Sequence, residues 1–335
     1  MSLSASGTTV TIILPTLNER AHLRDCLDSL ARQDCTQIVE ILVVDGGSTD
    51  GTREIAEGTP SPVVLVPNPR ITAAAAMNIG IEAARGDIVV RADAHTIYAP
   101  DYVRRCVEVL VETGADNVGG RMCPVGTTSF GRAVAAVTAS PLGIGPGKFH
   151  YYGERTDVDT VYLGCWWTAK LRELGGYDER DLQWAAEDQE LNFRIRRDGG
   201  RIVLDPSIRS SYFPRETVRA LWRQYFNYGV AKASTLKKHR QLPSPRPLAP
   251  AALVAASVVM GAMGRRPALR LALPILHSVA VATAALSISE DAGVAPHEAA
   301  IALGTCHWSY GLGFWSGVGR IARGKPFDSR PRSHR

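Results

Sequence analysis

The stretch VVRADAHTIY (residues 89–98) carries an apolar strand pattern directly into two polar side chains, Asp93 and His95. Successive side chains of a strand point to opposite faces, so residues two apart share a face. Asp93 and His95 are therefore expected to converge on one ligand. A strand end next to a helix cap produces the same triplet without any ligand, because a D-x-H pattern alone is a weak signal. The sequence patterns of the neighbouring segments distinguish these two interpretations.

Apolar strands and helical patterns alternate around this stretch, from residue 10 to about residue 114. Continuous apolar strands joined by helices predict an α/β fold with a mostly parallel sheet covered on both faces. Ligands of such sheets bind at the carboxyl ends of the strands. The predicted strands are 10–14, 39–44, 62–66 and 87–91, and the predicted helices are a first one through Leu23 and Leu30 with Asn18 as a possible N-cap, a short one near 51–57, one closing on Gly86, and one from Pro100 to Gly114.

The pattern loosens between residues 115 and 165, where glycine and proline are frequent. We expect a long insertion or lid there, with a short helix near 130–139, because loops of this size are often functional. Further along, the sequence predicts strands at 161–167 and 201–205, a short helix after the first of them, a helix starting at Glu187, and a polar helix at 216–239.

Bulk composition places the main domain in the cytosol. The six cysteines form no C-x-x-C pair, which indicates reduced thiols. The N-terminal residues lack a basic region followed by an apolar core, so no signal peptide is expected.

The composition changes at residue 241, where a proline-rich segment precedes three apolar stretches, 248–264, 269–288 and 299–319. A membrane-spanning helix needs about 20 apolar residues, a length that the last two stretches reach. Basic residues flank that pair, whereas the loop between them has no lysine or arginine, which predicts a membrane hairpin with this loop outside. The first stretch has basic residues at both ends and is expected to be interfacial or re-entrant. A buried helical subdomain is the alternative, and Gly313 and Gly317 would allow close helix contact.

Polar clusters follow three of the predicted strands: PTLNE (15–19), DGGSTDGT (45–52) and ADAH (92–95). Three clusters at one edge of a sheet predict one site. The loops fit neither a Walker motif, which needs a lysine, nor a dinucleotide fingerprint, which needs glycines after the first strand. Asp45 is suited to accept hydrogen bonds from a base N–H or a ribose hydroxyl. Ser48, Thr49 and Asp50 could also be turn and cap residues.

Taken in order, ILPTLNE, VVDGGSTDGT, ADAH, LGGYDE and AAEDQELNFRIRRDGGRI resemble the motifs of family-2 inverting glycosyltransferases with the GT-A fold. The segment YFPRETVRALWRQYFNYGVAK and the apolar tail resemble the succinoglycan-type exopolysaccharide transferases of that family. The resemblance implies a Rossmann-like mixed sheet with helices on both faces. It divides the chain into a GT-A domain (1–240), a proline-rich linker (241–247), membrane-associated helices (248–320) and a basic tail (321–335).

The resemblance also assigns roles to individual residues. Asp93 and His95 occupy the D-x-D motif that binds a divalent cation, and the histidine favours Mn²⁺ over Mg²⁺. Glu187 and Asp188 match the E-D pair, with Asp188 as general base, although two acids at a helix start can merely complement its dipole. The nucleotide-sugar set is Pro15, Thr16, Asn18, Glu19, Asp45, Ser48, Asn78, Asp93 and Arg215. The acceptor set is Gly164, Trp166, Trp167 and Gln224, with core packing as the alternative for one tryptophan.

The predicted function is transfer of a single hexose from a nucleotide sugar, UDP-glucose or similar, to a lipid-linked or glycan acceptor. The setting would be exopolysaccharide or cell-envelope glycan synthesis at the cytoplasmic face of the cell membrane, with no nucleic-acid partner. WRQYFNYG lacks the tryptophan of the processive Q-x-x-R-W motif, which predicts single transfer. The alternative is a non-catalytic, membrane-bound nucleotide-sugar-binding scaffold with a degenerate site. A nucleotidyltransferase would need a glycine- and basic-rich triphosphate loop, which PTLNER does not provide.

Overall fold

The computed structural model describes residues 7–60, 62–143, 148–180, 187–240, 246–263 and 267–324. Its packing divides the chain into two compact units, one of residues 1–123 with 148–212 and one of residues 124–147 with 213–335. The second unit therefore consists of the segment 124–147 and the chain from Phe213 onward, whereas the sequence predicts a border near residue 240. Most of the proposed linker, residues 241–245, and the tail from residue 325 lie outside the described residues.

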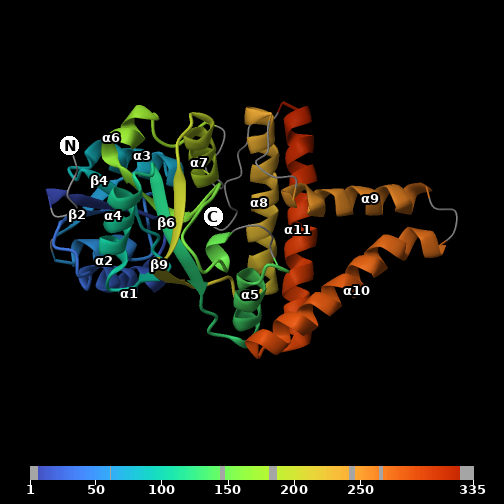
Figure 1. Ribbon diagram of the computed structural model, residues 1–335. Helices are drawn as coiled ribbons and strands as arrows, with labels where there is room; N and C mark the ends of the chain where they lie inside the picture. The colour runs from blue at the N-terminus through green and yellow to red at the C-terminus, as the bar shows by residue number, and fades with distance from the viewer. Residues whose placement is uncertain are drawn as a thin grey trace. The chain divides into compact units, whose positions relative to one another are not determined.

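The first unit is built on a mixed sheet with the strand order β3-β2-β1-β4-β8-β6-β9-β5, and β7 pairs with β9. Strands β2, β4, β6 and β9 of this sheet are labelled in Figure 1. The four strands β3, β2, β1 and β4 are parallel, and β8 pairs antiparallel with β4. The strands are β1 Val10–Thr16, β2 Ile38–Asp45, β3 Val63–Pro67, β4 Ile88–Arg91, β5 Thr96–Tyr98, β6 Asn117–Pro124, β7 Thr156–Asp157, β8 Tyr162–Trp167 and β9 Ile202–Tyr212. The helices of this unit are α1 Arg20–Ala31, α2 Thr52–Glu57, α3 Ala73–Ala83, α4 Tyr102–Thr113, α6 Thr168–Glu173 and α7 Glu187–Arg197, with the 3₁₀ turn η2 at Lys148–His150.

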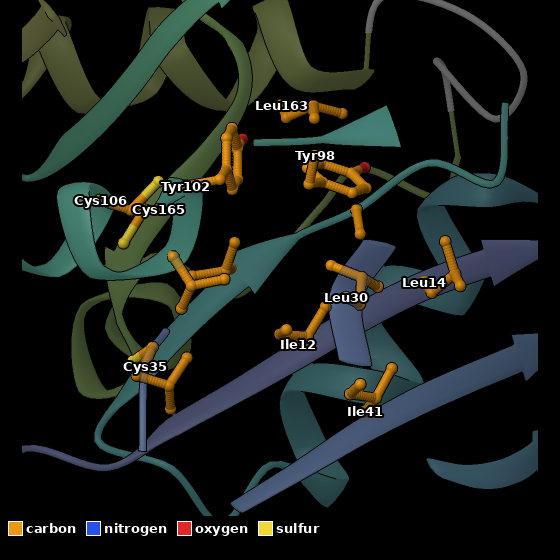
Figure 2. Packing of buried hydrophobic residues seen from close by; sticks show 14 of the residues in the cluster. Ile12, Leu14, Leu30, Cys35, Ile41, Tyr98, Tyr102, Cys106, Leu163 and Cys165 are labelled. Carbon is orange, nitrogen blue, oxygen red and sulfur yellow. The ribbon is translucent and has the colours of Figure 1, made fainter. Parts of the chain in front are cut away.

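Helices cover both faces of this sheet, because alternate strand residues enter two separate cores. Ile12 and Leu14 of β1 join the core that contains α1 and α4, and Figure 2 shows them among the residues of that cluster. Ile13 joins the other core, which contains α3, α6 and α7. The same alternation runs through β2 and β4. The prediction of a sheet that is apolar on both faces is confirmed.

Some local expectations were wrong for identifiable reasons. Asn18 does not cap α1; Glu19 occupies the N-cap position, and Asn18 adopts a left-handed conformation with φ 56°. The third helix ends at Ala83, and Gly86 is instead needed because a Cβ there would overlap the backbone of Thr11. Strand β6 lies in the segment expected to be an irregular insertion, and β9 extends beyond the predicted residue 205 to Tyr212.

The second unit is helical. It comprises α5 Ser129–Ala139, α8 Val218–His239, α9 Ala249–Met263, α10 Pro267–Ala292 and α11 Pro296–Ala322, with the 3₁₀ turn η3 at Arg246–Leu248. Helices α8 and α11 pack closely, because Gly313 lies against the backbone of Phe226 and Gly317 lies against Val230 and Ala233. The expected close contact at this G-x-x-x-G pattern is confirmed, within one chain.

The membrane hairpin expected from the sequence is supported for one of its two arms. Among the described helices, one segment, Arg270–Ala292 of α10, is long and apolar enough to cross a membrane, and α9 is a shorter apolar helix. Helix α11 does not meet this condition. Its buried residues include Ala299, Ala302, Thr305, Ser309, Gly313 and Gly317.

Candidate active site

The carboxyl ends of β1, β2 and β4 meet at one edge of the sheet. Thr16 at the end of β1 is opposite Asp45 at the end of β2, and Ile13 of β1 is opposite Arg91 at the end of β4. Neighbouring strands are about 4.8 Å apart, so the two outer strands of the three are separated by about 10 Å. The prediction that three polar clusters share one edge is confirmed by this register.

Asp45 organises the loop that follows β2. Its carboxylate is 3% exposed and accepts hydrogen bonds from the Gly47 N–H (2.9 Å), the Ser48 N–H (3.0 Å) and the Ser48 hydroxyl. The Arg53 Nε is 3.9 Å from the same carboxylate. Gly47 has φ 88°, a conformation that glycine adopts without strain. Asp45 is thus fixed in place before any ligand arrives.

The loop after β1 is bound to the loop after β2. The Asn18 N–H donates to Ser48 Oγ (2.8 Å), the Thr49 N–H donates to Asn18 Oδ1 (3.0 Å), and the Glu19 N–H donates to Thr52 Oγ1 (2.8 Å). These bonds make one rigid rim from two of the three polar clusters. Within it, Asp50 accepts from the N–H and the hydroxyl of Thr52, as the capping interpretation expects.

Thr16 has an unsatisfied hydroxyl inside this rim. The residue is 5% exposed, and its Oγ1 has no hydrogen-bond partner within the described parts of the chain. Buried hydroxyls normally have a partner, and an orphan needs an explanation such as an absent ligand. Pro15 precedes it in β1, opposite Val44.

A buried arginine connects Asp93 to the helix that carries Glu187 and Asp188. Arg91 Nε donates to Asp93 Oδ1 (3.3 Å), and Arg91 Nη2 donates to Glu187 Oε1 (3.1 Å). The carboxylates of Asp93 and Glu187 outweigh the burial that would lower the pKa of Arg91, and its pKa lies well above the ordinary value. Burial raises the pKa of Glu187 even though Arg91 opposes the shift. Sequence reasoning missed Arg91; the available signal was a charged residue ending an otherwise apolar strand.

Strand alternation does not determine the position of His95, although this alternation was the basis for predicting it as a ligand. Strand β4 ends at Arg91, and residues 92–95 form a turn before β5. The His95 ring packs edge-to-face on Tyr212, with ring centroids 5.3 Å apart. The side chains of Asp93 and His95 are half-buried, and a carboxylate and an imidazole are suitable ligands for Mn²⁺. In the described ranges, no three His, Cys, Asp or Glu residues form a metal-binding group.

Helix α7 begins with Glu187, which is buried, and Asp188, which is half-buried. The Gln189 N–H donates to Asp188 Oδ1 (2.7 Å). Arg194 anchors the helix by donating to the carbonyl oxygens of Leu174 and Gly176 (both 2.6 Å). Arg194 therefore anchors the last turn of α7, whereas Glu187 in the first turn is held by Arg91.

The remaining predicted site residues divide into structural and unassigned groups. Trp166 is fully buried and packs edge-to-face with Tyr177 at 6.4 Å, so its ring cannot present a face to a sugar; the core-packing alternative applies to it. Trp167 is only partly buried, and Gly164 has φ 127°. The Asn78 amide bonds to the backbone N–H and C=O of Tyr177 and to Glu179, which makes it an internal brace.

Two predicted site residues belong to the helical unit. Gln224 donates to the Tyr228 hydroxyl (3.1 Å), and Arg215 precedes α8. Because the strand-end residues belong to the other unit, the donor role of Arg215 and the acceptor role of Gln224 stay predictions.

All six cysteines are free, and five of them are buried. This agrees with the reduced thiols expected from their spacing.

Comparisons with known proteins point to one family. The family model for glycosyl transferase family 2 matches residues 11–156. The succinoglycan biosynthesis protein ExoA of Rhizobium meliloti (strain 1021) is 34% identical over 263 residues, which cover 77% of this chain and 78% of the relative.

Two solved structures share the fold. A mannosyltransferase from Pyrobaculum calidifontis, solved with GDP-Man and Mn²⁺, has a TM-score of 0.57 at 22% identity and covers 93% of this chain and 87% of its own. Residues 1–349 of TarS from S. aureus, solved with UDP-GlcNAc, have a TM-score of 0.52 at 16% identity and cover 95% and 93%. The strand-end motifs, the GT-A fold and the relative that spans most of the chain lead to one conclusion: the chain belongs to glycosyl transferase family 2.

Proposed function

We propose that this protein is a divalent-cation-dependent inverting glycosyltransferase. It moves one hexose from a nucleoside-diphosphate sugar, UDP-linked or similar, to a lipid-linked or glycan acceptor at the cytoplasmic face of a membrane. The observation that carries the proposal is the meeting of the polar ends of β1, β2 and β4 at one edge of the sheet. The relative named for succinoglycan biosynthesis supports a role in exopolysaccharide or cell-envelope glycan synthesis.

The rim formed by the first two loops suits the nucleotide. Asp45 is fixed by its loop, and the Thr16 hydroxyl, which has no partner among the described residues, offers a hydrogen bond to a base or ribose. Asn18, Glu19 and Ser48 hold the two loops together, so their contribution is to the shape of the rim. Both solved structures with this fold are complexes with a nucleotide sugar, which supports this choice of donor.

Asp93 and His95 would hold the cation. A bound cation supplies positive charge to a departing diphosphate. Mn²⁺ is preferred because imidazole is a better ligand for Mn²⁺ than for Mg²⁺, and the mannosyltransferase was solved with Mn²⁺.

Asp188 is proposed as the general base. It takes the proton from an acceptor hydroxyl while that oxygen forms a bond to the anomeric carbon. The bond from this carbon to the diphosphate breaks at the same time, and the leaving nucleoside diphosphate keeps the electron pair. Attack on the face opposite the leaving group inverts the configuration. A general base of this kind contributes roughly 10²–10⁴ to the rate.

The test is a screen of nucleotide sugars against the detergent-purified protein, with Mn²⁺ or with EDTA, followed by mass spectrometry of the product. We expect transfer of one sugar with Mn²⁺ alone. Asp188→Asn should lower kcat by about 10²–10⁴ while nucleotide binding persists. Asp198→Asn, just after the other end of α7, is the matched control and should keep its turnover. A wild-type protein that binds nucleotide sugar but transfers nothing would favour the scaffold alternative.

His95→Ala tests the cation assignment. We expect the Mn²⁺ concentration needed for half-maximal activity to rise about tenfold or more, as mutations at metal sites typically do. Equal activity and equal Mn²⁺ dependence in this variant would exclude His95 as a ligand.

A further inference from the structure

Arg91 is a charged residue inside the sheet, and it is neither a proposed cation ligand nor the proposed general base. It is the last residue of β4, with β1 on one side and β8 on the other, and it is 8% exposed. Arginine is almost never this buried unless it is paired, because its charge loses the surrounding water. The residue therefore needs a reason to occupy this position.

Strand alternation explains why Arg91 reaches α7. Ile88 and Val90 of β4 enter the core that contains α1 and α4, whereas Val89 enters the opposite core. Arg91 follows Val89 by two residues and so shares its face. Tyr177 and residues of α7 lie on that face, and the Arg91 guanidinium carbon is 6.0 Å from the centre of the Tyr177 ring.

The two ion pairs of Arg91 join elements that are distant in the sequence. Nε reaches Asp93 in the turn after β4, and Nη2 reaches Glu187 at the start of α7, 96 residues away along the chain. A guanidinium presents its N–H groups in a rigid plane, so it fixes two carboxylates relative to each other. A lysine ammonium has the same charge but cannot impose this geometry.

One nitrogen of Arg91, Nη1, is buried and has no hydrogen-bond partner in the described ranges. An unsatisfied buried donor lowers the stability of a fold. Stability alone therefore does not explain why an arginine occupies this position. The arrangement fits a residue kept for the geometry of the site.

We propose that Arg91 is a positioning residue of the glycosyl transfer, holding Asp93 of the cation-binding turn and the first residue of the base-carrying helix in one fixed geometry. The inference rests on the proposed function, because Asp93 and Asp188 have their roles only there. It predicts that the fork shape of Arg91 matters in addition to its charge.

The experiment compares Arg91→Met, Arg91→Lys and the double variant Arg91→Met/Glu187→Met with the wild-type protein. Three quantities are measured: kcat and KM with the best donor, the Kd of UDP and GDP with and without MnCl₂, and the thermal midpoint. The matched control is Arg85→Met, because Arg85 also pairs with a buried carboxylate, Glu40 (2.8 Å), before β4 begins.

We expect Arg91→Met to lower kcat about 100-fold, since small displacements of reacting groups have effects of this size. Arg91→Lys should recover only part of the loss. The double variant should regain the thermal midpoint, because apolar replacements of a buried ion pair are tolerated, but should stay as inactive as Arg91→Met. Mn²⁺-dependent UDP binding should weaken severalfold in all three variants and stay unchanged in Arg85→Met.

The outcomes separate this inference from the proposed function. A folded Arg91→Met or double variant that keeps kcat and Mn²⁺-dependent binding within about threefold of wild type overturns the inference alone, as does full rescue by lysine. A wild-type protein that transfers no sugar and binds neither nucleotide overturns the proposed function and the inference with it.

Discussion

Asp45 has two tasks that substitutions at this one residue can separate. Its carboxylate holds the loop through the Gly47 and Ser48 N–H groups and the Ser48 hydroxyl, and it is also the proposed contact for the nucleotide. Asn keeps an acceptor oxygen of the same shape for the loop but has no charge. Ala removes every acceptor.

Asp45→Ala should therefore lower both the free energy of unfolding and the nucleotide affinity. Leaving these loop donors unsatisfied costs about 1–3 kcal/mol. Asp45→Asn should keep most of the stability and lose nucleotide affinity. Denaturant unfolding and calorimetric titration with UDP measure the two effects, and an Asp45→Ala protein as stable as wild type would show that the loop is held by other contacts.

His150 makes the first unit sensitive to acid. It lies in the 3₁₀ turn η2, its buried Nδ1 has no partner within the described residues, and burial lowers its pKa from 6.5 to about 4. Between these two values the unfolded chain binds a proton that the folded chain does not. The stability is thus fully present above pH 6.5 and falls, by up to about 3 kcal/mol, as the pH drops toward 4.

The variant His150→Leu should lose this part of the pH dependence. Urea midpoints of wild type and variant, measured at half-unit steps from pH 7.5 to 4, give the comparison. Parallel curves for the two proteins would mean that other groups cause the acid sensitivity.

At the scale of elements, α11 contains one glycine that is tightly packed against another helix and one that has open space around it. A Cβ on Gly313 would overlap the backbone carbonyl of Phe226 in α8, whereas a Cβ on Gly304 would meet nothing within 4 Å. Backbone atoms of a packed helix cannot move aside cheaply, so the first glycine is required by packing and the second is not.

The same substitution should therefore have opposite effects in one helix. Gly313→Ala should destabilise the protein by about 1–3 kcal/mol through overpacking. Gly304→Ala should stabilise it by up to about 1 kcal/mol, because alanine favours the helix. Thermal unfolding of both variants measures the difference, and equal shifts would contradict the close packing of α8 and α11.

Elements with a local signal could be predicted from the sequence, and those with a tertiary cause could not. β1, β2 and β4 are mostly apolar, so their existence and their polar ends could be predicted directly. β6 was missed because its glycines are required by contact with a strand that is distant in the sequence. A Cβ on Gly120 would overlap the backbone of Ile208 in β9. The site followed the same rule. Its strand-end residues were predictable, but the bond from Arg91 to Glu187 depends on a fold that brings distant residues together.

At the scale of the whole molecule, α10 is the element suited to a bilayer. Its side chains Ile275, Leu276 and Val279 are more than half exposed, and the segment is long and apolar enough to cross. Helix α11 buries its small residues against α8 instead. Among the described helices, these observations support α10 as one arm of the hairpin expected from the sequence and do not support α11 as the other.

Leu276→Asp should move the protein from the membrane fraction to the soluble fraction. A carboxylate near the centre of a spanning helix costs about 3 kcal/mol. Leu312→Asp, at an exposed position of α11, should leave the distribution unchanged. Ultracentrifugation of cell lysates followed by immunoblotting measures the distribution of each variant. Release of the Leu312→Asp protein into the soluble fraction would support the two-helix hairpin instead.

The order in which the chain visits its two units has a consequence for biosynthesis. The polypeptide leaves the first unit after residue 123, returns at residue 148 and departs again after residue 212. Strand β8, which lies between β4 and β6, is therefore synthesised only after the α5 segment has been made. A nascent chain stalled on the ribosome near residue 150 would hold β4 and β6 without the strand that joins them. We expect such an arrested chain to be digested rapidly by protease, and resistance to appear only when β9 has cleared the exit tunnel.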